Sequence, residues 1–456
     1  MTIQATRQSI PAARTPIAAR RVEPAALPRQ LRDRFIGPVH LPGEAGYDLH
    51  RQPLHPGLDP RPAMVVEACG PADVRTAVLA ARELDLPFAV QATGHGTYLP
   101  ADGGVLVKTC GLGTVLVDPA RRIARVGPGA RWGDVLTATA PFGLAPLSGS
   151  ATTVGVTGFT LGGGFGWLGR KHGFAADSVV RAEVVTANGR VLTASGDRNP
   201  DLFWAIRGGG GNFGVVTSLE FRLYPVARVY AGALYYPLEA ATDTMARYRD
   251  WAETVPDELS TAILLREMPD TPETPTPIRG RRVLVIKAMY AGPAAPAERL
   301  IQPLRSTAGP ALVDDLRPIR YADAAMGGTA ARYLDLFERV PHAALDALVT
   351  AYTRPDSQVA AIEIRHWGGA IARPGADAGP VGHRTAPFSV IVDGNDPELV
   401  ERLRPHGIGG SFLNFLNDPS RTASAYTAAD YAKLRAVKAA YDPDNLFRIN
   451  HNIPPA

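Results

Sequence analysis

The sequence of 456 residues contains only two cysteines, Cys69 and Cys110. They are far apart and form no CxxC pair, so neither a disulfide framework nor a zinc site built on thiolates is predicted. We expect both thiols to be small buried side chains. The chain also lacks an apolar run of about 20 residues, the length that a membrane-spanning helix requires. We therefore expect no membrane span and no metal centre.

The sequence also has no large excess of basic over acidic residues. The sequence has 48 basic and 44 acidic residues, and its formal net charge is +4. The basic residues are scattered, whereas a nucleic-acid-binding protein gathers them on one face, so nucleic acid is not an expected partner. Arg20 and Arg21 are followed by Val-Glu-Pro rather than by an apolar stretch, which argues against a twin-arginine export signal. We expect a cytoplasmic protein.

Glycine is abundant between Pro146 and Gly173, where it recurs at nearly every second or third position. It accumulates where the backbone turns through positive φ or approaches a ligand closely. Consecutive amides without side chains can bind an anion, and a pyrophosphate is the anion we expect. Gly164, Gly166 and Gly169 spell GxGxxG, but the acidic residue that a Rossmann fold places about 20 positions later is missing. The stretch therefore predicts a phosphate-binding loop of another kind.

The hydrophobic pattern changes near Pro225. Before it, short strands are expected at 63–68, 88–90, 105–108, 115–118, 123–126, 178–186, 191–194 and 215–223, with helices at 71–84, 132–139 and 199–206. After it, longer strands are expected at 229–236, 260–267, 282–290 and 358–367, with helices at 240–254, 294–307 and 343–352. The second half therefore predicts one antiparallel sheet backed by helices. A final helix ends at Tyr441 and leads into an ordered tail.

The expected strand at 358–367 has two unlike faces. Side chains alternate along a strand, so one face carries Ala360, Ile362, Ile364 and His366, and the other Val359, Ala361, Glu363, Arg365 and Trp367. The first face suits packing on helices. The second suits a ligand cavity, although a solvated sheet face fits the pattern equally well.

Five long segments carry a family resemblance: ATGHG at 92–96, VGPGARWGDV at 126–135, TVGVTGFTLGGGFGWLGRKHGFAADSV at 153–179, NPDLFWAIRGGGGNFGVVTSLEFRLYPV at 199–226 and YDPDNLFRINHNIPP at 441–455. They resemble the flavin-linked oxidoreductases of the para-cresol methylhydroxylase (PCMH) and vanillyl-alcohol oxidase superfamily, in its berberine bridge enzyme-like branch. The resemblance implies an α+β fold with a two-part PCMH-type FAD-binding domain and an inserted α+β substrate domain, one antiparallel sheet backed by helices. The first 30 residues, rich in Ala, Arg and Pro without periodicity, predict a flexible arm at 1–30, and the change near Pro225 separates two domains. With the resemblance, the expected boundaries are the FAD-binding domain at 31–228 with its core at about 60–228, the substrate domain at 229–420 and a segment at 421–456 that returns to the FAD domain.

For the cofactor, the resemblance implies FAD tethered through His95. A neutral imidazole nitrogen is nucleophilic near neutral pH, which suits this bond. Many relatives add a cysteine tether at the position of Ala151, so a single tether is implied here. The residues implied to hold FAD lie in the glycine-rich loops and the tail: His95, Thr93, Gly94, Gly96, Thr97, Ser150, Thr153, Gly155, Val156, Gly158, Gly162, Gly163, Gly164, Gly166, Gly214, Val215, Val216, Asn450 and Asn452.

The catalytic base is less evident. Relatives commonly carry a Tyr-x-Asn-Tyr motif whose second tyrosine can remove the substrate proton, whereas this chain has Phe412 and Phe415. A phenyl ring cannot accept a proton. The remaining candidates are Glu363, His366 and Tyr98, with Arg365 as an electrostatic partner, and structural packing is the alternative role of each. Sugar-oxidising relatives carry an acid at the position of Arg365, which argues against a simple sugar substrate.

We therefore expect an FAD-dependent oxidase that takes a hydride from a medium-sized organic substrate, such as a secondary metabolite, and is reoxidised by O2. One alternative is a dehydrogenase with another electron acceptor. The other is a flavin-retaining protein that catalyses a non-redox cyclisation or only binds a ligand. The expected partners are the small-molecule substrate and O2, and the expected state is a monomer or a homodimer.

Overall fold

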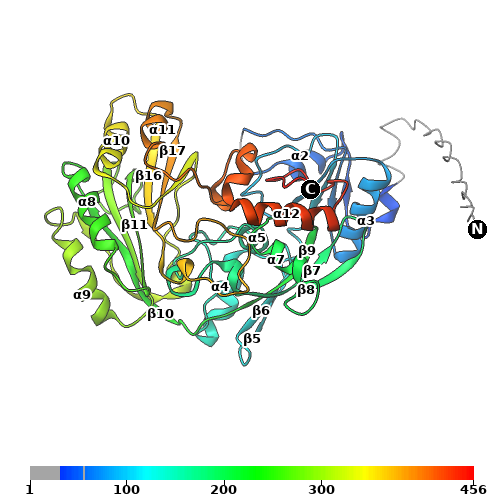
Figure 1. The fold of residues 1–456 in the computed structure, drawn as a ribbon, viewed down its shortest axis with the longest axis horizontal. Coiled ribbons are helices and arrows are strands. Elements are labelled where there is room, and N and C mark those ends of the chain that lie inside the picture. Colours follow the sequence, from blue (N-terminus) through cyan, green and yellow to red (C-terminus); the bar gives the residue numbers. More distant parts are fainter. Residues whose placement is uncertain (1–30, 55–56) are drawn as a thin grey trace, which may run out of the picture.

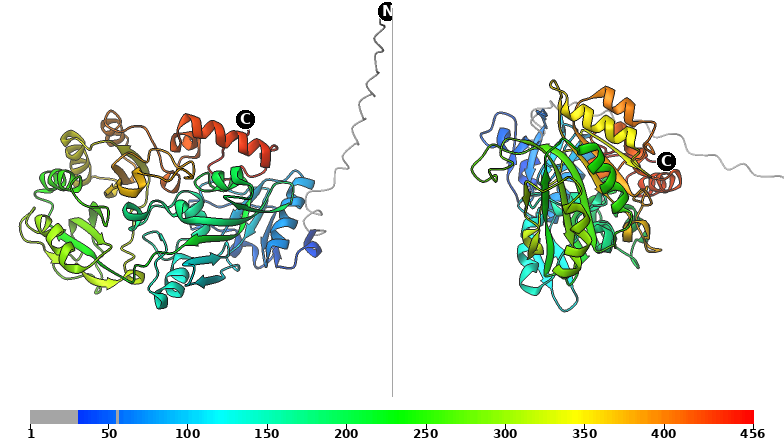
Figure 2. Two further views of the ribbon diagram at one scale, coloured as in Figure 1. Left: turned by 60° about the horizontal axis from the view of Figure 1, so that its bottom comes forward. Right: turned by 90° about the vertical axis from the view of Figure 1, so that its left-hand side faces the viewer.

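The computed structural model describes residues 31–54 and 57–456, so the arm predicted at 1–30 lies outside the described residues. Within the described part of the chain, the strands form sheets of four, five and eight strands. The two smaller sheets form a first lobe, and the eight-stranded sheet with its helices forms a second lobe (Figure 1). The left view of Figure 2 shows the same two lobes, with the C-terminal helix beside the first.

The four-stranded sheet has the order β1-β2-β4-β3, and β4 pairs in parallel with both β2 and β3. Its elements are β1 (Val39–His40), α2 (Tyr47–Arg51), β2 (Met64–Glu67), α3 (Pro71–Glu83), β3 (Phe88–Gln91) and β4 (Val105–Lys108). Proline is well tolerated in the first turn of a helix, and α3 starts with Pro71. Its apolar side, including Val74 and Val78, packs on Val66 and Val107 of the sheet.

The five-stranded sheet is antiparallel, with the order β5-β6-β9-β7-β8. Its strands are β5 (Val115–Asp118), β6 (Ile123–Val126), β7 (Val179–Val185), β8 (Val191–Ser195) and β9 (Val215–Arg222), and the adjoining helices are α4 (Trp132–Thr139), α5 (Val156–Leu161), α6 (Gly169–His172), α7 (Pro200–Ile206) and α12 (Ala428–Tyr441). Leu434 and Val437 of α12 join the core that Trp132 and Phe221 build in this lobe. The C-terminal helix therefore packs on the first lobe, next to α7 (Figure 1).

The eight-stranded sheet follows the order β13-β10-β12-β11-β16-β17-β15, and β14 also pairs with β10. Its strands are β10 (Arg228–Tyr236), β11 (Leu259–Glu267), β12 (Arg282–Tyr290), β13 (Val313–Asp314), β14 (Arg317–Arg320), β15 (Tyr333–Phe337), β16 (Val359–His366) and β17 (Phe388–Gly394), and its helices are α8 (Ala241–Ala252), α9 (Ala294–Arg305), α10 (His342–Thr353) and α11 (Pro397–Leu403). Elsewhere in the described residues, short 3-10 helices lie at Arg32–Arg34, Ala140–Phe142, Ala175–Ser178, Tyr321–Asp323, Gly369–Ala372, Leu413–Phe415 and Pro419–Ala425. The four helices cover the sheet face that points away from the first lobe (Figure 1). The prediction of one antiparallel sheet backed by helices is confirmed.

Strand β16 places its side chains largely as its alternation predicts. Ile362 and Ile364 join the core under the helices, and Glu363 and Arg365 point to the opposite face. Val359 is an exception, because it also belongs to the helix-covered core. A bulge between Val359 and Ala361 explains the difference, since an extra residue in a strand reverses the alternation beyond it.

The prediction that both cysteines are buried is wrong, because Cys69 and Cys110 are exposed. Each lies two residues beyond the end of a strand, Cys69 after β2 and Cys110 after β4. Helix α3 packs on the strands and not on the loops that follow them, so side chains in these loops stay exposed. Among the described residues, no helix is both long and apolar enough to span a membrane.

Candidate active site

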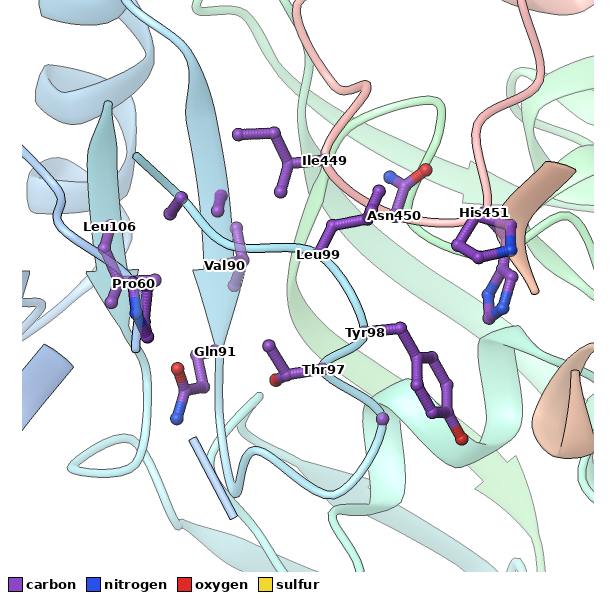
Figure 3. Close-up of a pocket in the computed structure, with 14 residues that line it drawn as sticks. Pro60, Val90, Gln91, Thr97, Tyr98, Leu99, Leu106, Ile449, Asn450 and His451 are labelled. Carbon is purple, nitrogen blue, oxygen red and sulfur yellow. The ribbon is translucent and has the colours of Figure 1, made fainter. Parts of the chain in front are cut away.

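A cleft opens where the loop after β3 meets the C-terminal tail. Gly96, Thr97 and Tyr98 of the loop line it, as do Asn450 and His451 of the tail (Figure 3). The rings of Tyr98 and His451 lie 5.7 Å apart between centroids. Segments far apart in the sequence therefore build one site, and three of the residues predicted to hold FAD line it: Gly96, Thr97 and Asn450.

His95 lies in the same loop and is exposed. Its Nε2 is 3.1 Å from Oγ1 of Thr153, a residue of the predicted cofactor segment at 150–158. Partial burial of the ring and the nearby Arg131 lower the pKa of His95 below its ordinary value. The imidazole is therefore neutral near pH 7, the state in which a ring nitrogen is nucleophilic.

Two glycines shape this loop differently. Gly94 has φ of 80°, and a Cβ there would lie 3.0 Å from the backbone nitrogen of Leu54. A larger residue is therefore excluded at Gly94 by both conformation and space. A Cβ at Gly96 would meet nothing within 4 Å. Thr93 packs beside Gly155, where a Cβ would lie 3.4 Å from the Thr93 side chain. The loops at 93–97 and 150–158 are therefore neighbours.

Several buried polar atoms in these segments have no hydrogen-bond partner among the described residues: Ser150 Oγ, Asn450 Oδ1 and Asn452 Oδ1. Buried polar atoms are rarely left unpaired in proteins. Gly158 is exposed, and a Cβ there would meet nothing within 4 Å. Unpaired polar atoms beside bare backbone fit a large polar ligand such as FAD.

The amides of Gly162, Gly163 and Gly164, which were predicted to bind phosphate, instead form hydrogen bonds within the protein. The N–H groups of Gly162, Gly163 and Gly164 donate to Gly158 O, Thr160 O and Asn414 Oδ1. These three amides are engaged within the protein and are not free for a phosphate. A Cβ at Gly166 would lie 1.8 Å from the carbonyl oxygen of Ser148. Close packing of the backbone explains these glycines, and the pyrophosphate prediction now depends on the loops at 93–97 and 150–158.

Gly214, Val215 and Val216 also lie within the packed interior. Gly214 has φ of 151°, and a Cβ there would lie 2.5 Å from the Val184 side chain. Val215 and Val216 are in β9 and have their side chains in the hydrophobic cores. Val156 likewise is buried at the start of α5, where its N–H donates to Ala130 O. None of these four residues lines the cleft of Tyr98 and His451, and their contact with FAD stays a prediction.

The face of the large sheet opposite its helices carries a charged group. Glu363 is fully buried, and its Oε1 accepts from Arg365 Nε at 2.6 Å and Nη2 at 2.5 Å. Glu363 Oε2 is buried without a hydrogen-bond partner in the described residues. The Arg365 guanidinium lies over Phe165 and Trp167, 5.4 and 5.2 Å from the ring centroids. The glycine-rich segment of the first lobe therefore contacts the charged pair of the second.

Lys287 belongs to the same group and was not predicted. It lies in the cross-strand row that Ala262 and Arg365 also occupy, and its Nζ donates to Met326 O at 2.6 Å and Gly327 O at 3.2 Å. Burial lowers its pKa to about 8, an effect that the nearby Glu363 opposes. The sequence marks Lys287 as a lone charged residue within the apolar strand VLVIKAMY. Which residues lie beside it depends on the strand register, which the sequence alone does not give.

His366 and Tyr98 are not part of this charged group. His366 points to the other face of β16, stacks on Phe388 and pairs with Arg170 Nη1 at 2.8 Å. Burial and Arg170 hold its pKa well below the ordinary value, so it is a neutral interface residue. Tyr98 lines the cleft, where burial raises its pKa. Of the four predicted catalytic residues, the structure brings together only Glu363 and Arg365.

The two phenylalanines at the tyrosine positions differ in burial. Phe412 is buried and stacks on Phe174 with a centroid distance of 5.3 Å, whereas Phe415 is partly exposed. Between them, Asn414 accepts from Gly164 N at 2.8 Å and donates to Phe159 O at 2.9 Å. Asn414, which was also not predicted, fixes this segment to the glycine-rich stretch.

The fold and the cleft define an FAD-dependent oxidoreductase, and comparisons with known proteins agree. Residues 62–195 match the model of the FAD binding domain, and residues 411–454 match the model described as berberine and berberine like. An FAD-linked oxidoreductase of Dictyostelium discoideum is 30% identical over 419 residues, covering 86% of this chain and 89% of the relative. The (R)-6-hydroxynicotine oxidase of Paenarthrobacter nicotinovorans is 30% identical over 458 residues, covering 92% of this chain and 97% of the relative.

Solved structures share the fold over nearly the whole chain. The crystal structure of 6-hydroxy-D-nicotine oxidase from Arthrobacter nicotinovorans superimposes with a TM-score of 0.79 at 25% identity, covering 92% of this chain and 98% of that one. Berberine bridge enzyme from Eschscholzia californica gives a TM-score of 0.78 at 20% identity, covering 94% and 99%. This chain belongs to the berberine bridge enzyme-like family of FAD-linked oxidoreductases. The predicted family and the α+β fold with a PCMH-type FAD-binding domain are confirmed.

Proposed function

We propose that this enzyme is an oxidase for a medium-sized organic substrate, with FAD attached through His95 alone and Glu363 as the proton acceptor. The observation that carries the proposal is the buried Glu363 carboxylate, one oxygen of which is held by Arg365 while the other has no partner among the described residues. It lies on the sheet face that meets the glycine-rich segment of the FAD-binding domain.

When bound, FAD accepts a hydride from the substrate and passes the electrons to O2. Ser150, Asn450 and Asn452 would hold it through polar atoms that have no partner among the described residues. Thr153 Oγ1 pairs with His95 Nε2 and leaves Nδ1 for the tether. Ala151 offers only a methyl group at the position where relatives carry a second tether, so one covalent bond is proposed.

Glu363 would take the proton that leaves the substrate. Its Oε1 is fixed by two bonds from Arg365, which orients the carboxylate and leaves Oε2 as the acceptor. Phe165 and Trp167 limit the movement of Arg365 from the side of the FAD-binding domain. A positioned base of this kind contributes about 100- to 10,000-fold to a rate.

The tether is tested by the colour of acid-precipitated protein. We expect a yellow pellet from the wild type and a colourless one from His95→Ala, because no other side chain is proposed to bond the flavin. Cys69→Ser and Cys110→Ser are the matched controls and should stay yellow, since both thiols are exposed and neither lines the cleft. A yellow pellet from His95→Ala would contradict the single tether.

The role of Glu363 is tested by anaerobic reduction of the flavin. The substrate panel should contain cyclic amines, aromatic alcohols and simple sugars. Among the amines, 6-hydroxynicotine is included because one relative is a 6-hydroxynicotine oxidase. With a substrate that bleaches the flavin, we expect Glu363→Gln to slow reduction by about 100-fold or more. An unchanged rate rules out Glu363 as the base. Hydrogen peroxide formed in proportion to substrate favours an oxidase over a dehydrogenase, and a flavin that no substrate bleaches favours non-redox chemistry.

A further inference from the structure

Two histidines and a glutamate meet at the edge of the four-stranded sheet, outside the flavin site. His40 ends β1, His50 lies on α2 and Glu67 ends β2. His40 Nε2 is 2.7 Å from Glu67 Oε1, and His50 Nδ1 is 3.4 Å from Glu67 Oε2. The imidazole rings are stacked, with centroids 4.5 Å apart and planes 6° from parallel. All three potential ligand atoms lie within 4.8 Å of one another.

We propose that His40, His50 and Glu67 bind one divalent transition-metal ion, with Zn²⁺ as the best fit. Two imidazole nitrogens and one carboxylate oxygen are a donor set that Zn²⁺ favours, with water in the fourth position. Zinc lies about 2.0 to 2.2 Å from such ligands, so small side-chain movements bring all three atoms onto one ion. The sequence predicts no metal centre because these ligands belong to no spacing motif and meet only in the folded chain.

The surrounding backbone holds the three ligands in place. His40 pairs with Val65 in the β1 to β2 register, and Glu67 N donates to Pro38 O at 2.9 Å. A Cβ at Gly46 would lie 2.3 Å from His40 Nδ1, so glycine lets the start of α2 close over the ring. The ligand side chains are only 18 to 28% exposed. Such a half-buried site limits both their motion and their hydration.

The position of the site suggests a structural role for the ion. The chain after α2 runs directly onto the His95 loop, where Gln91 Nε2 donates to Gln52 O at 3.1 Å. Gly94 has no side chain, and the backbone of Pro53 and Leu54 passes beside it. An ion that fixes α2 to β1 and β2 would also fix this covering segment against the His95 loop.

The test is a calorimetric titration of chelator-treated, FAD-loaded protein with ZnCl2. We expect one equivalent to bind and the melting temperature to rise with bound metal. His50→Gln and Glu67→Gln each remove one ligand and should weaken binding by about 100-fold or more. His406→Gln, which changes an exposed histidine outside the cluster, is the control and should bind like the wild type.

Flavin content of each variant is measured alongside, because a variant with full flavin has kept its fold. The two ligand variants change separate elements, so a folding defect in one leaves the other informative. Absence of saturable binding to the wild type overturns the proposal, as does binding that both variants retain. In either case, the cluster is a hydrogen-bonded group only.

Discussion

One buried ion pair lies where the C-terminal helix, the tail and the FAD-binding domain meet. Lys438 and Asp442 have fully buried side chains, and Lys438 Nζ lies 2.6 Å from Asp442 Oδ2. The same ammonium group donates to Asn212 O at 2.8 Å and to Phe447 O at 3.2 Å. Asp442 also accepts from the backbone N–H groups of Leu446 and Phe447. Lys438→Met therefore tests whether the pair fixes the tail that carries Asn450 and Asn452 to the site.

The expected loss of stability follows from what the substitution leaves behind. Methionine fills much of the same volume but removes all three bonds that Lys438 makes. Asp442 remains buried with two backbone donors and no cation. Breaking a buried pair by removing one partner costs about 3 to 5 kcal/mol. Burial lowers the pKa of Lys438, and the Asp442 carboxylate opposes that effect. We therefore expect Lys438→Met to lower the free energy of unfolding by about 3 to 5 kcal/mol.

The assay is urea unfolding of a double-mutant cycle with Lys438→Met, Asp442→Asn and both together. Because either single change leaves a charged group unpaired, the double variant should be more stable than the sum of the single losses predicts. Lys433→Met on the same helix is the matched control. Its ammonium group lies 3.9 Å from the Trp204 ring centroid, a contact worth about 0.5 to 1 kcal/mol at an exposed site. Additive losses, or a loss for Lys438→Met no larger than that of the control, would refute the reasoning.

Two further predictions concern pH and packing. Burial lowers the pKa of His172 from 6.5 to about 4. Between pH 6.5 and pH 4, the unfolded chain therefore binds a proton at this histidine and the folded chain does not. The free energy of unfolding falls as the pH drops through this range. His172→Gln should remove about 2 kcal/mol from the stability difference between pH 7 and pH 5 in urea unfolding; an unchanged difference contradicts the assignment. Gly166→Ala should lower stability by about 1 to 3 kcal/mol or more, because its Cβ would meet the carbonyl oxygen of Ser148. Gly196→Ala, where a Cβ would meet nothing within 4 Å, is the control, and equal melting temperatures for the two variants would disprove the packing argument.

The sequence predicts best those elements whose ends are marked by charged residues, glycine or proline. Strand β12 spans Arg282–Tyr290 as predicted, and α4 spans Trp132–Thr139 as predicted. Strand β17, with the sequence FSVIVDG, was not predicted, and its buried run of five residues is shorter than the run of seven in β12. A short apolar run without alternation does not distinguish a strand from part of a helix. Helix α5 was not predicted, because the glycines within and around it favour a loop.

Within the candidate site, residues close in sequence were easier to find than partners across the fold. Glu363 and Arg365 are two positions apart on one strand, so alternation alone places both on the same face. Lys287 reaches them only through the register of β12 with β11 and of β11 with β16. The pairing of His95 with Thr153 likewise depends on how two loops fold together. The local sequence pattern therefore predicts neighbours on one strand, whereas contacts between separate segments are known only from the tertiary structure.

The glycine-rich stretch connects the two halves of the candidate active site. On one side, Gly164 N donates to Asn414, and the backbone at Gly166 passes directly over the Ser148 carbonyl. On the other side, Phe165 and Trp167 lie against the Arg365 guanidinium, which holds Glu363. The side chains between the glycines therefore set the position of the proposed base, while the glycines let the backbone lie close to the domain that holds FAD. A bulkier residue within the stretch should therefore displace Glu363 before it affects the proposed His95 tether.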